Sequence, residues 1–177
     1  LCISLLNPQK DEVIADLCAA PGGKTLMISN LLEGTGQVFA SDVSEKRLEK
    51  LKENLAGQSN VTVHCLDARD SETEQKFDAI LLDVPCSNTG VLRRKPDARW
   101  SFSKNKLNEL VKLQAEILAQ STKMLKPGGR ICYSTCSIEA AENIEQVNNF
   151  LKSNSNFELK ESRQLTPCPQ HDGAFVA

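Results

Sequence analysis

The chain has 177 residues, of which 40% are hydrophobic and 25% charged, and its formal net charge is −2. These values are typical of one globular domain with a sizeable core, and they exclude a chain that binds nucleic acid as a polycation. No apolar run approaches the roughly 20 residues that span a membrane. The seven cysteines are scattered and only two histidines accompany them. We therefore expect thiols in a reducing cytoplasm and no metal site.

Short apolar runs alternate with segments of helical periodicity along the chain. The pattern predicts strands at 13–16, 37–41, 61–66, 77–82 and 130–133, with a further strand at 157–160 and the first half of a last one within 165–177. It predicts helices at 1–6, 26–32, 44–57, 107–125 and 139–151, and a long basic loop at 84–101. Strands that alternate with helices through short connections indicate one doubly wound α/β domain over residues 1–177, with a mostly parallel sheet.

A glycine-rich turn, Leu17-Cys18-Ala19-Ala20-Pro21-Gly22-Gly23-Lys24-Thr25, follows the strand that ends in Asp16. A strand that enters such a turn and then a helix builds a nucleotide-type pocket, because glycine lets the backbone approach the ligand and the helix N-terminus offers N–H groups. The turn lacks both the dinucleotide pattern and the first glycine of a P-loop. A cationic adenosyl ligand without phosphates suits this turn better than a dinucleotide or a nucleoside triphosphate does, which indicates S-adenosylmethionine.

Four consecutive predicted strands end in an acid, at Asp16, Asp42, Asp67 and Asp83. Aspartate is common after strands because it suits turns. Four such acids in order around one glycine turn nevertheless favour a pocket, since ligands bind beyond the carboxyl ends of parallel strands. Asp42 lies where an acid holds a ribose in nucleotide-binding sheets.

Two cysteines directly follow strand ends: Cys86 comes after Pro85, and Cys136 comes after Thr135. If their strands are neighbours, both thiols lie over the edge of the sheet that carries the cofactor turn. Cationic neighbours or a helix N-terminus lower the pKa of a thiol. The backbone of Cys18 is expected to line the turn, and the remaining cysteines are expected to fill the core.

Two thiols beside a methyl donor indicate carbon methylation of a pyrimidine. A thiolate that adds to C6 of cytosine makes C5 nucleophilic enough to take a methyl group. A second group must then help to remove the C5 proton, and an acid such as Asp83 can hold N3 and N4 of the base.

Several motifs resemble those of the Sun-type RNA cytosine-5 methyltransferases, and the resemblance covers essentially the whole chain. The motifs are Asp16–Thr25, Asp83-Val84-Pro85-Cys86-Ser87 with Thr89-Gly90, Arg93-Arg94-Lys95-Pro96-Asp97 with Trp100, Tyr133-Ser134-Thr135-Cys136-Ser137 and Asp172-Gly173-Ala174-Phe175. The Arg-Arg-x-Pro-Asp-x-x-Trp segment is more similar to the bacterial branch that acts on 16S rRNA than to eukaryotic relatives.

The resemblance implies a Rossmann-like methyltransferase fold with an antiparallel last strand, truncated here. It places the methionine end of S-adenosylmethionine against Cys18, Ala19, Ala20, Pro21, Gly22, Gly23 and Lys24. It implies that Asp42 binds the ribose and that Asp67 binds the adenine side. Asp83 would face both the cofactor and the cytosine. Cys136 would be the nucleophile, whereas Cys86 would assist proton loss and product release.

The chain departs from this family at a few points. Asn88 stands where Gly is common, and Ala174 replaces the first Phe of the closing motif. The N-terminal RNA-binding region of the family is absent. We expect a catalytic fragment that is a monomer, with rRNA as its partner. Phosphate contacts are expected from the basic cluster Arg93, Arg94, Lys95 and Arg99, for which a solvated loop is the alternative. A non-catalytic module that binds S-adenosylmethionine or RNA, and a methyltransferase for another substrate such as DNA or protein, stay open.

Overall fold

A computed structural model describes residues 1–70 and 74–177. The strands are β1 (Val13–Asp16), β2 (Gln37–Asp42), β3 (Val61–Cys65), β4 (Phe77–Asp83), β5 (Leu125–Thr135), β6 (Arg163–Leu165) and β7 (Ala174–Val176). The α-helices are α1 (Cys2–Leu6), α2 (Gly23–Leu31), α3 (Glu45–Asn54), α4 (Asp97–Ser101), α5 (Lys104–Ser121) and α6 (Ile144–Ser153). Short 3₁₀ turns are η1 (Thr89–Val91), η2 (Thr122–Met124) and η3 (Ala140–Glu142).

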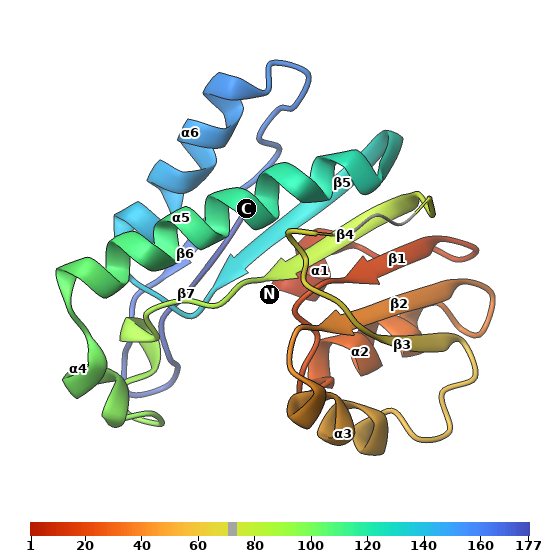
Figure 1. The fold of residues 1–177 in the computed structure, drawn as a ribbon, viewed down its shortest axis with the longest axis horizontal. Helices are drawn as coiled ribbons and strands as arrows, with labels where there is room; N and C mark the ends of the chain where they lie inside the picture. Colours follow the sequence, from red (N-terminus) through yellow and green to blue (C-terminus); the bar gives the residue numbers. More distant parts are fainter. Residues whose placement is uncertain (71–73) are drawn as a thin grey trace. The chain divides into compact units, whose positions relative to one another are not determined.

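The strands form one seven-stranded sheet in the order β3-β2-β1-β4-β5-β7-β6 (Figure 1). β1 pairs in parallel with β2 and β4, and β2 pairs in parallel with β3. β7 is antiparallel to both β5 and β6. The predicted fold class, a mostly parallel α/β sheet with an antiparallel last strand, is confirmed. Within the described residues, no helix is both long and apolar enough to cross a membrane.

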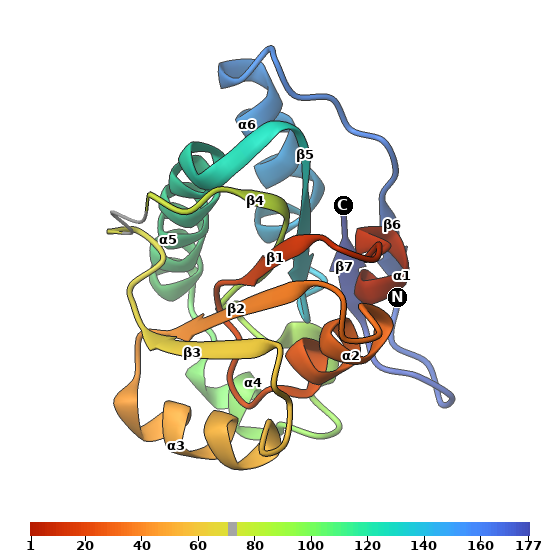
Figure 2. The same cartoon turned by 90° about the vertical axis from the view of Figure 1, so that its right-hand side faces the viewer.

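The chain divides into two compact units, residues 1–83 with 120–132 and residues 84–119 with 133–177. In the first unit, α3 presents leucines to the alanines of the glycine-rich turn. Ser44 caps the start of this helix, since its hydroxyl accepts a hydrogen bond from Arg47 N–H at 3.4 Å. In the second unit α6 lies beside α5 (Figures 1 and 2), and Gln146 donates to the Val111 carbonyl at 3.2 Å.

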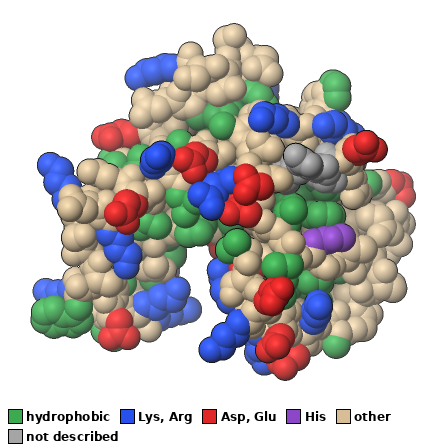
Figure 3. All heavy atoms as spheres, in the orientation of Figure 1, with side chains coloured by type: hydrophobic (Ala, Val, Ile, Leu, Met, Phe, Trp, Pro, Cys, Tyr) green, Lys and Arg blue, Asp and Glu red, His purple; other side chains and the backbone are tan. Residues whose placement is uncertain are grey.

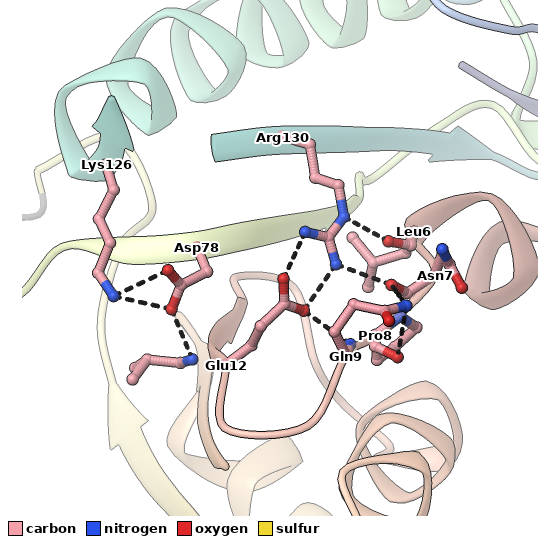
Figure 4. A network of polar contacts seen from close by, with 9 residues as sticks. Leu6, Asn7, Pro8, Gln9, Glu12, Asp78, Lys126 and Arg130 are labelled. Atoms are coloured by element: carbon pink, nitrogen blue, oxygen red, sulfur yellow. Dashed lines mark hydrogen bonds and ion pairs between the residues drawn. The ribbon is translucent and has the colours of Figure 1, made fainter. Parts of the chain in front are cut away.

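A polar network in the first unit fixes the amino ends of β1 and β4 against β5 (Figure 4). Lys126 Nζ lies 2.9 and 2.8 Å from the two carboxylate oxygens of Asp78, which also accepts the Val13 N–H at 2.8 Å. Arg130 binds both oxygens of Glu12, at 2.6 and 2.7 Å, and donates to two carbonyls at the end of α1. These contacts hold the strands at their starts, so the carboxyl ends of β1 and β4 remain available to a site.

Several predictions of local structure are wrong, and the helix predicted at 139–151 is the 3₁₀ turn η3 followed by α6. Residues 157–160 form no strand, because Phe157 instead packs its ring edge-on against Phe150 of α6, with centroids 5.3 Å apart. The helix predicted to reach Leu125 ends at Ser121, and residues 126–129 belong to β5, where Lys126 binds Asp78. The long loop at 84–101 contains η1 and α4.

Candidate functional site

The turn after β1 depends on the glycine at position 22. Gly22 has φ +109°, and a Cβ added there would lie 2.9 Å from Cδ1 of Leu51 on α3. Only glycine therefore combines this backbone conformation with so close an approach of the helix. A Cβ at Gly23 would meet nothing within 4 Å, so the first residue of α2 faces open space. The N–H groups of the first turn of a helix have no partner inside it and suit a ligand.

Side chains of α3 bind the turn from the other side. Arg47 donates to the Ala20 carbonyl at 2.9 Å, and Asn54 donates to the Pro21 carbonyl at 2.8 Å. The Ala20–Pro21 peptide bond is cis. The predicted cofactor-binding residues Cys18 to Lys24 are thus a single turn, supported by one amphipathic helix.

Asp42 ties the same turn to the start of α3. One carboxylate oxygen accepts the Ala20 N–H at 3.3 Å and lies 3.1 Å from the Arg47 guanidinium, and the other accepts the Ser44 N–H at 3.1 Å. The side chain is buried. Asp42 therefore already holds three donors of the protein while it lies at the carboxyl end of β2, where the sequence predicted a ribose ligand.

Asp16 is the most constrained acid of the site. It is 1% exposed, its Oδ2 accepts the Thr25 hydroxyl at 2.8 Å, and its Oδ1 has no partner among the described residues. The pKa of Asp16 is raised to about 7, mainly by burial and also by the nearby Asp83 carboxylate, whereas the Thr25 hydrogen bond opposes the shift. Buried acceptors are almost always paired, so this oxygen is a candidate acceptor for a ligand. Sequence analysis identified Asp16 as a strand-end acid only.

Lys24 and Asp83, both predicted site residues, form an ion pair. Lys24 Nζ lies 2.6 Å from Asp83 Oδ2, and both side chains are about one-third exposed, at 36% and 32%. Burial alone would lower the pKa of Lys24, but the Asp83 carboxylate outweighs it and the pKa is raised. The pair joins the start of α2 to the end of β4.

Asp67 follows β3 and pairs with Arg69. Its two oxygens accept from Arg69 Nε at 3.0 Å and Nη2 at 2.6 Å, and this bond holds the pKa of Asp67 below its usual range. The side chain is 22% exposed.

The second unit brings together the two cysteines that sequence analysis singled out. Their sulfur atoms lie 3.1 Å apart, and Asn88 Oδ1 lies 3.0 Å from Cys136 Sγ. The hydrogen bond with Cys136, followed by burial, raises the pKa of Cys86 far above its usual range. All seven cysteines of the chain are thiols. Cys86 is therefore the member of the pair that keeps its proton.

A buried network fixes the residues that follow the two thiols. Glu142, fully buried, accepts the Ser87 N–H at 2.9 Å, the Ser87 hydroxyl, and Gln114 Nε2 at 2.9 Å. The Ser87 and Ser137 hydroxyls are 3.0 Å apart. Because Ser87 follows Cys86 and Ser137 follows Cys136, the network sets the separation of the sulfur atoms. The role of Glu142 was not predicted, because its spacing in the sequence resembles that of a surface acid.

Gly90 closes the loop around Cys136. Its N–H donates to the Cys136 carbonyl at 3.0 Å, and its own carbonyl accepts the Gly173 N–H at 2.8 Å. A Cβ at Gly90 would lie 2.6 Å from the Gly173 oxygen. The segment near the C-terminus thus packs directly on the thiol loop.

The predicted phosphate-binding cluster is partly engaged within the protein. Arg94 Nε lies 2.8 Å from Asp172, Arg93 Nη1 donates to the Pro169 carbonyl at 2.8 Å, and Lys95 Nζ binds the Asn88 side chain at 3.1 Å. These contacts tie the loop to the C-terminal segment.

The neighbouring helix α4 carries Arg99 and Trp100. Arg99 is exposed, and Trp100 is 84% exposed. Figure 3 shows Lys and Arg side chains beside a hydrophobic group over this helix. An exposed aromatic ring among cations has the composition of a surface for single-stranded nucleic acid. Among the residues that the structure describes, no group of acids, histidines and cysteines has the arrangement of a metal site.

Comparison with known proteins decides the family. A family model described as 16S rRNA methyltransferase RsmB/F matches residues 3–173. The chain belongs to this family. It is 43% identical over 190 residues to a ribosomal RNA small subunit methyltransferase B of Yersinia pseudotuberculosis, covering 99% of this chain and 44% of that protein. The chain therefore spans about half the length of the curated relatives it matches.

Solved structures of this family share the fold. NSun6 from Pyrococcus horikoshii with SFG is 32% identical, with a TM-score of 0.87 over 99% of this chain and 49% of that one. A methyltransferase homologue from the same organism is 30% identical, with a TM-score of 0.82 over 97% of this chain and 62% of that one. The resemblance to Sun-type methyltransferases is confirmed.

Proposed function

We propose that the chain is the catalytic domain of an S-adenosylmethionine-dependent RNA cytosine-5 methyltransferase that acts on rRNA. The observation that carries the proposal is the pair of thiols 3.1 Å apart, each just beyond one of two neighbouring strands. One thiol serves as the nucleophile that the reaction needs, and the other as a proton acceptor. We propose a monomer in the cytoplasm.

The turn after β1 fits S-adenosylmethionine. When bound, this cofactor supplies an electrophilic methyl group. The unpaired oxygen of Asp16 is available to a cationic ligand. The open space over Gly23 lets a ligand contact the backbone N–H groups at the start of α2. We propose that Cys18 to Lys24 hold its methionine end, Asp42 the ribose and Asp67 the adenine side. The related NSun6 structure, which contains the S-adenosylmethionine analogue SFG, supports S-adenosylmethionine as the cofactor.

Cys136 is proposed to attack C6 of the cytosine. The S–C6 bond forms as the Cys136 thiolate donates an electron pair, and the electrons of the C5–C6 double bond then take the methyl group at C5. Cys86 stays protonated while it faces the Cys136 sulfur, because that contact raises its pKa. Once Cys136 is a thioether it cannot carry a negative charge, so this cause of the raised pKa of Cys86 is removed and the pKa falls.

Cys86 then loses its own proton to water, and the thiolate that forms accepts the C5 proton. Departure of this proton restores the C5–C6 double bond and releases Cys136 from C6 as a thiolate. Asp83 precedes Cys86 by three residues and is proposed to bind N3 and N4 of the base, held in place by its ion pair with Lys24.

RNA phosphates are proposed to contact Arg93, Arg94, Lys95 and Arg99. Since Arg93 and Arg94 already face Asp172, phosphate must compete with that carboxylate at two of the four positions. The exposed face of α4, with Arg99 and Trp100, is therefore the more accessible part of this surface.

Transfer of labelled methyl groups to rRNA by the full-length protein tests the proposal. We expect Cys136→Ala to abolish transfer, whereas Cys65→Ala, which removes an exposed thiol of β3, leaves it unchanged. Cofactor binding in calorimetry without any transfer to RNA would indicate a non-catalytic binding module. Transfer to DNA or protein in preference to RNA would assign another substrate.

A further inference from the structure

Asn88 has a left-handed backbone conformation, with φ 60° and ψ 21°, between Cys86 and η1. This conformation favours Gly and tolerates Asn, which explains how Asn replaces the Gly that is common in the family. Unlike Gly, Asn88 carries an amide that reaches both cysteine segments. Its Nδ2 donates to the Cys86 carbonyl at 2.9 Å, and its Oδ1 lies 3.0 Å from Cys136 Sγ.

The Cys86 carbonyl fixes the orientation of this amide. A carbonyl oxygen only accepts hydrogen bonds, so the Asn88 nitrogen faces it and the Asn88 oxygen faces Cys136. In the neutral state Cys136 therefore donates its S–H to Asn88. With that proton directed away from Cys86, the contact between the sulfur atoms is a donation from Cys86 to Cys136. Each thiol therefore donates to the next group: Cys86 donates to Cys136, and Cys136 donates to Asn88.

Lys95 supplies a positive charge to the same amide oxygen. Its Nζ donates to Asn88 Oδ1 at 3.1 Å, and the side chain is otherwise exposed. Two contacts of 3.1 and 3.0 Å in series hold the ammonium group within about 6 Å of Cys136 Sγ. A cation at that distance favours the thiolate, although solvent screens part of the effect.

The titratable groups of the two cysteine segments and of the elements bonded to them are Cys86 after β4, Tyr133 on β5 and Glu142 in η3. Tyr133 donates to the Glu142 carbonyl at 2.7 Å, and burial raises the pKa of Tyr133, so the phenol stays neutral. Within this set Lys95 is the cation, and it acts on Cys136 through the Asn88 amide.

We propose that Asn88 and Lys95 are positioning residues that hold resting Cys136 as an oriented neutral thiol beside a positive charge. The proposal rests on the proposed function only in taking Cys136 as the nucleophile. The S–H bond to Asn88 favours the neutral thiol, whereas Lys95 favours the thiolate. When Cys136 ionises, its proton leaves for water, because neither an amide oxygen nor an ammonium group accepts it.

Alkylation of Cys136 by iodoacetamide as a function of pH measures these opposing effects. The full-length protein is used without RNA or cofactor, and mass spectrometry of fragment ions separates Cys136 from Cys132. We expect Asn88→Gly to lower the pH midpoint by roughly half a unit, because the loss of one neutral hydrogen bond lowers it more than the loss of the Lys95 contact raises it. Lys95→Met is expected to raise it by roughly half a unit or more, and Lys95→Arg to preserve it.

Asn7→Gly is the matched control. Asn7 caps α1 with a φ of 48°, so the variant makes the same replacement in the same type of backbone conformation away from the thiols. Its Cys136 midpoint is expected to equal that of the parent. Asn88→Asp keeps the shape of the side chain but adds a negative charge, and it is expected to raise the midpoint.

The proposal is overturned if Asn88→Gly leaves the Cys136 midpoint unchanged or raises it, or if Asn88→Asp or Lys95→Met lowers it. Because the assay involves no methyl transfer, it is independent of the proposed function. The expected midpoints in a protein that does not methylate RNA would refute the proposed function and leave the positioning of the thiol intact.

Discussion

The buried carboxyl group of Asp16 predicts an unusual dependence of stability on pH. Its pKa in the folded chain is about 7, whereas an Asp in an unfolded chain has a pKa of about 3.9. Between these values the folded state retains a proton that the unfolded state has lost. The free energy of unfolding therefore falls as pH rises from about 4 to about 7, by roughly 4 kcal/mol for a shift of about three units.

Asp16→Asn removes this titration. The Asn side chain still offers an oxygen to the Thr25 hydroxyl, and its NH₂ group takes the place of the unpaired Oδ1. We expect the variant to be no more stable than the parent near pH 5, since the parent carboxyl is then neutral and one buried NH₂ group lacks a partner. Near pH 8 we expect the variant to be more stable, by an amount on the order of a few kcal/mol.

Urea unfolding followed by circular dichroism across this pH range measures the difference between parent and variant. The difference cancels the titration of groups that do not interact with Asp16, so its change with pH reports Asp16 and the neighbours coupled to it, Asp83 and Lys24. A difference that stays constant across the range would mean that Asp16 is ionised in the folded chain throughout, and would refute the reasoning from burial.

Two further predictions concern the second unit. Glu142→Ala should destabilise the protein by about 3–5 kcal/mol, because it removes the acceptor of buried donors of Ser87 and Gln114. Glu142→Gln keeps an acceptor and should cost less than half of that free energy in the same urea titration. Equal losses of stability in the two variants would contradict the role of the network. Trp100→Ala should weaken binding of single-stranded RNA by an amount on the order of 1–3 kcal/mol if a base stacks on the ring. Fluorescence anisotropy measures the affinity, and Phe102→Ala, which removes a less exposed aromatic ring, is the comparison. Equal affinities of the parent and Trp100→Ala would exclude stacking.

The fold was predictable where local pattern decides it. The strands that end in Asp16, Asp42 and Asp83 are short apolar runs bounded by turn residues, and they pair as expected. The strand conformation of residues 126–129 was not predictable, because one Pro and two Gly residues locally indicate a turn. The ion pair between Lys126 and Asp78, 48 residues apart, holds it in β5.

The sequence allowed us to predict that the two cysteines meet, but not the contacts that surround the site residues. The order of strands brings Cys86 and Cys136 together, as the positions of both after strand ends suggested. The unpaired oxygen of Asp16 depends on which side chains surround it in three dimensions. The pairing of Arg94 with Asp172 likewise joins segments that are distant in the chain, so neither follows from spacing.

The central claim is that Cys136 forms the covalent bond to cytosine and that Cys86 is needed to release it. The most direct measurement is electrophoresis in SDS of the full-length Cys86→Ala protein after incubation with rRNA and S-adenosylmethionine. We predict a denaturation-resistant protein–RNA adduct that disappears in the double variant with Cys136→Ala. An adduct that accumulates with Cys136→Ala alone would reverse the two roles and contradict the proposed mechanism.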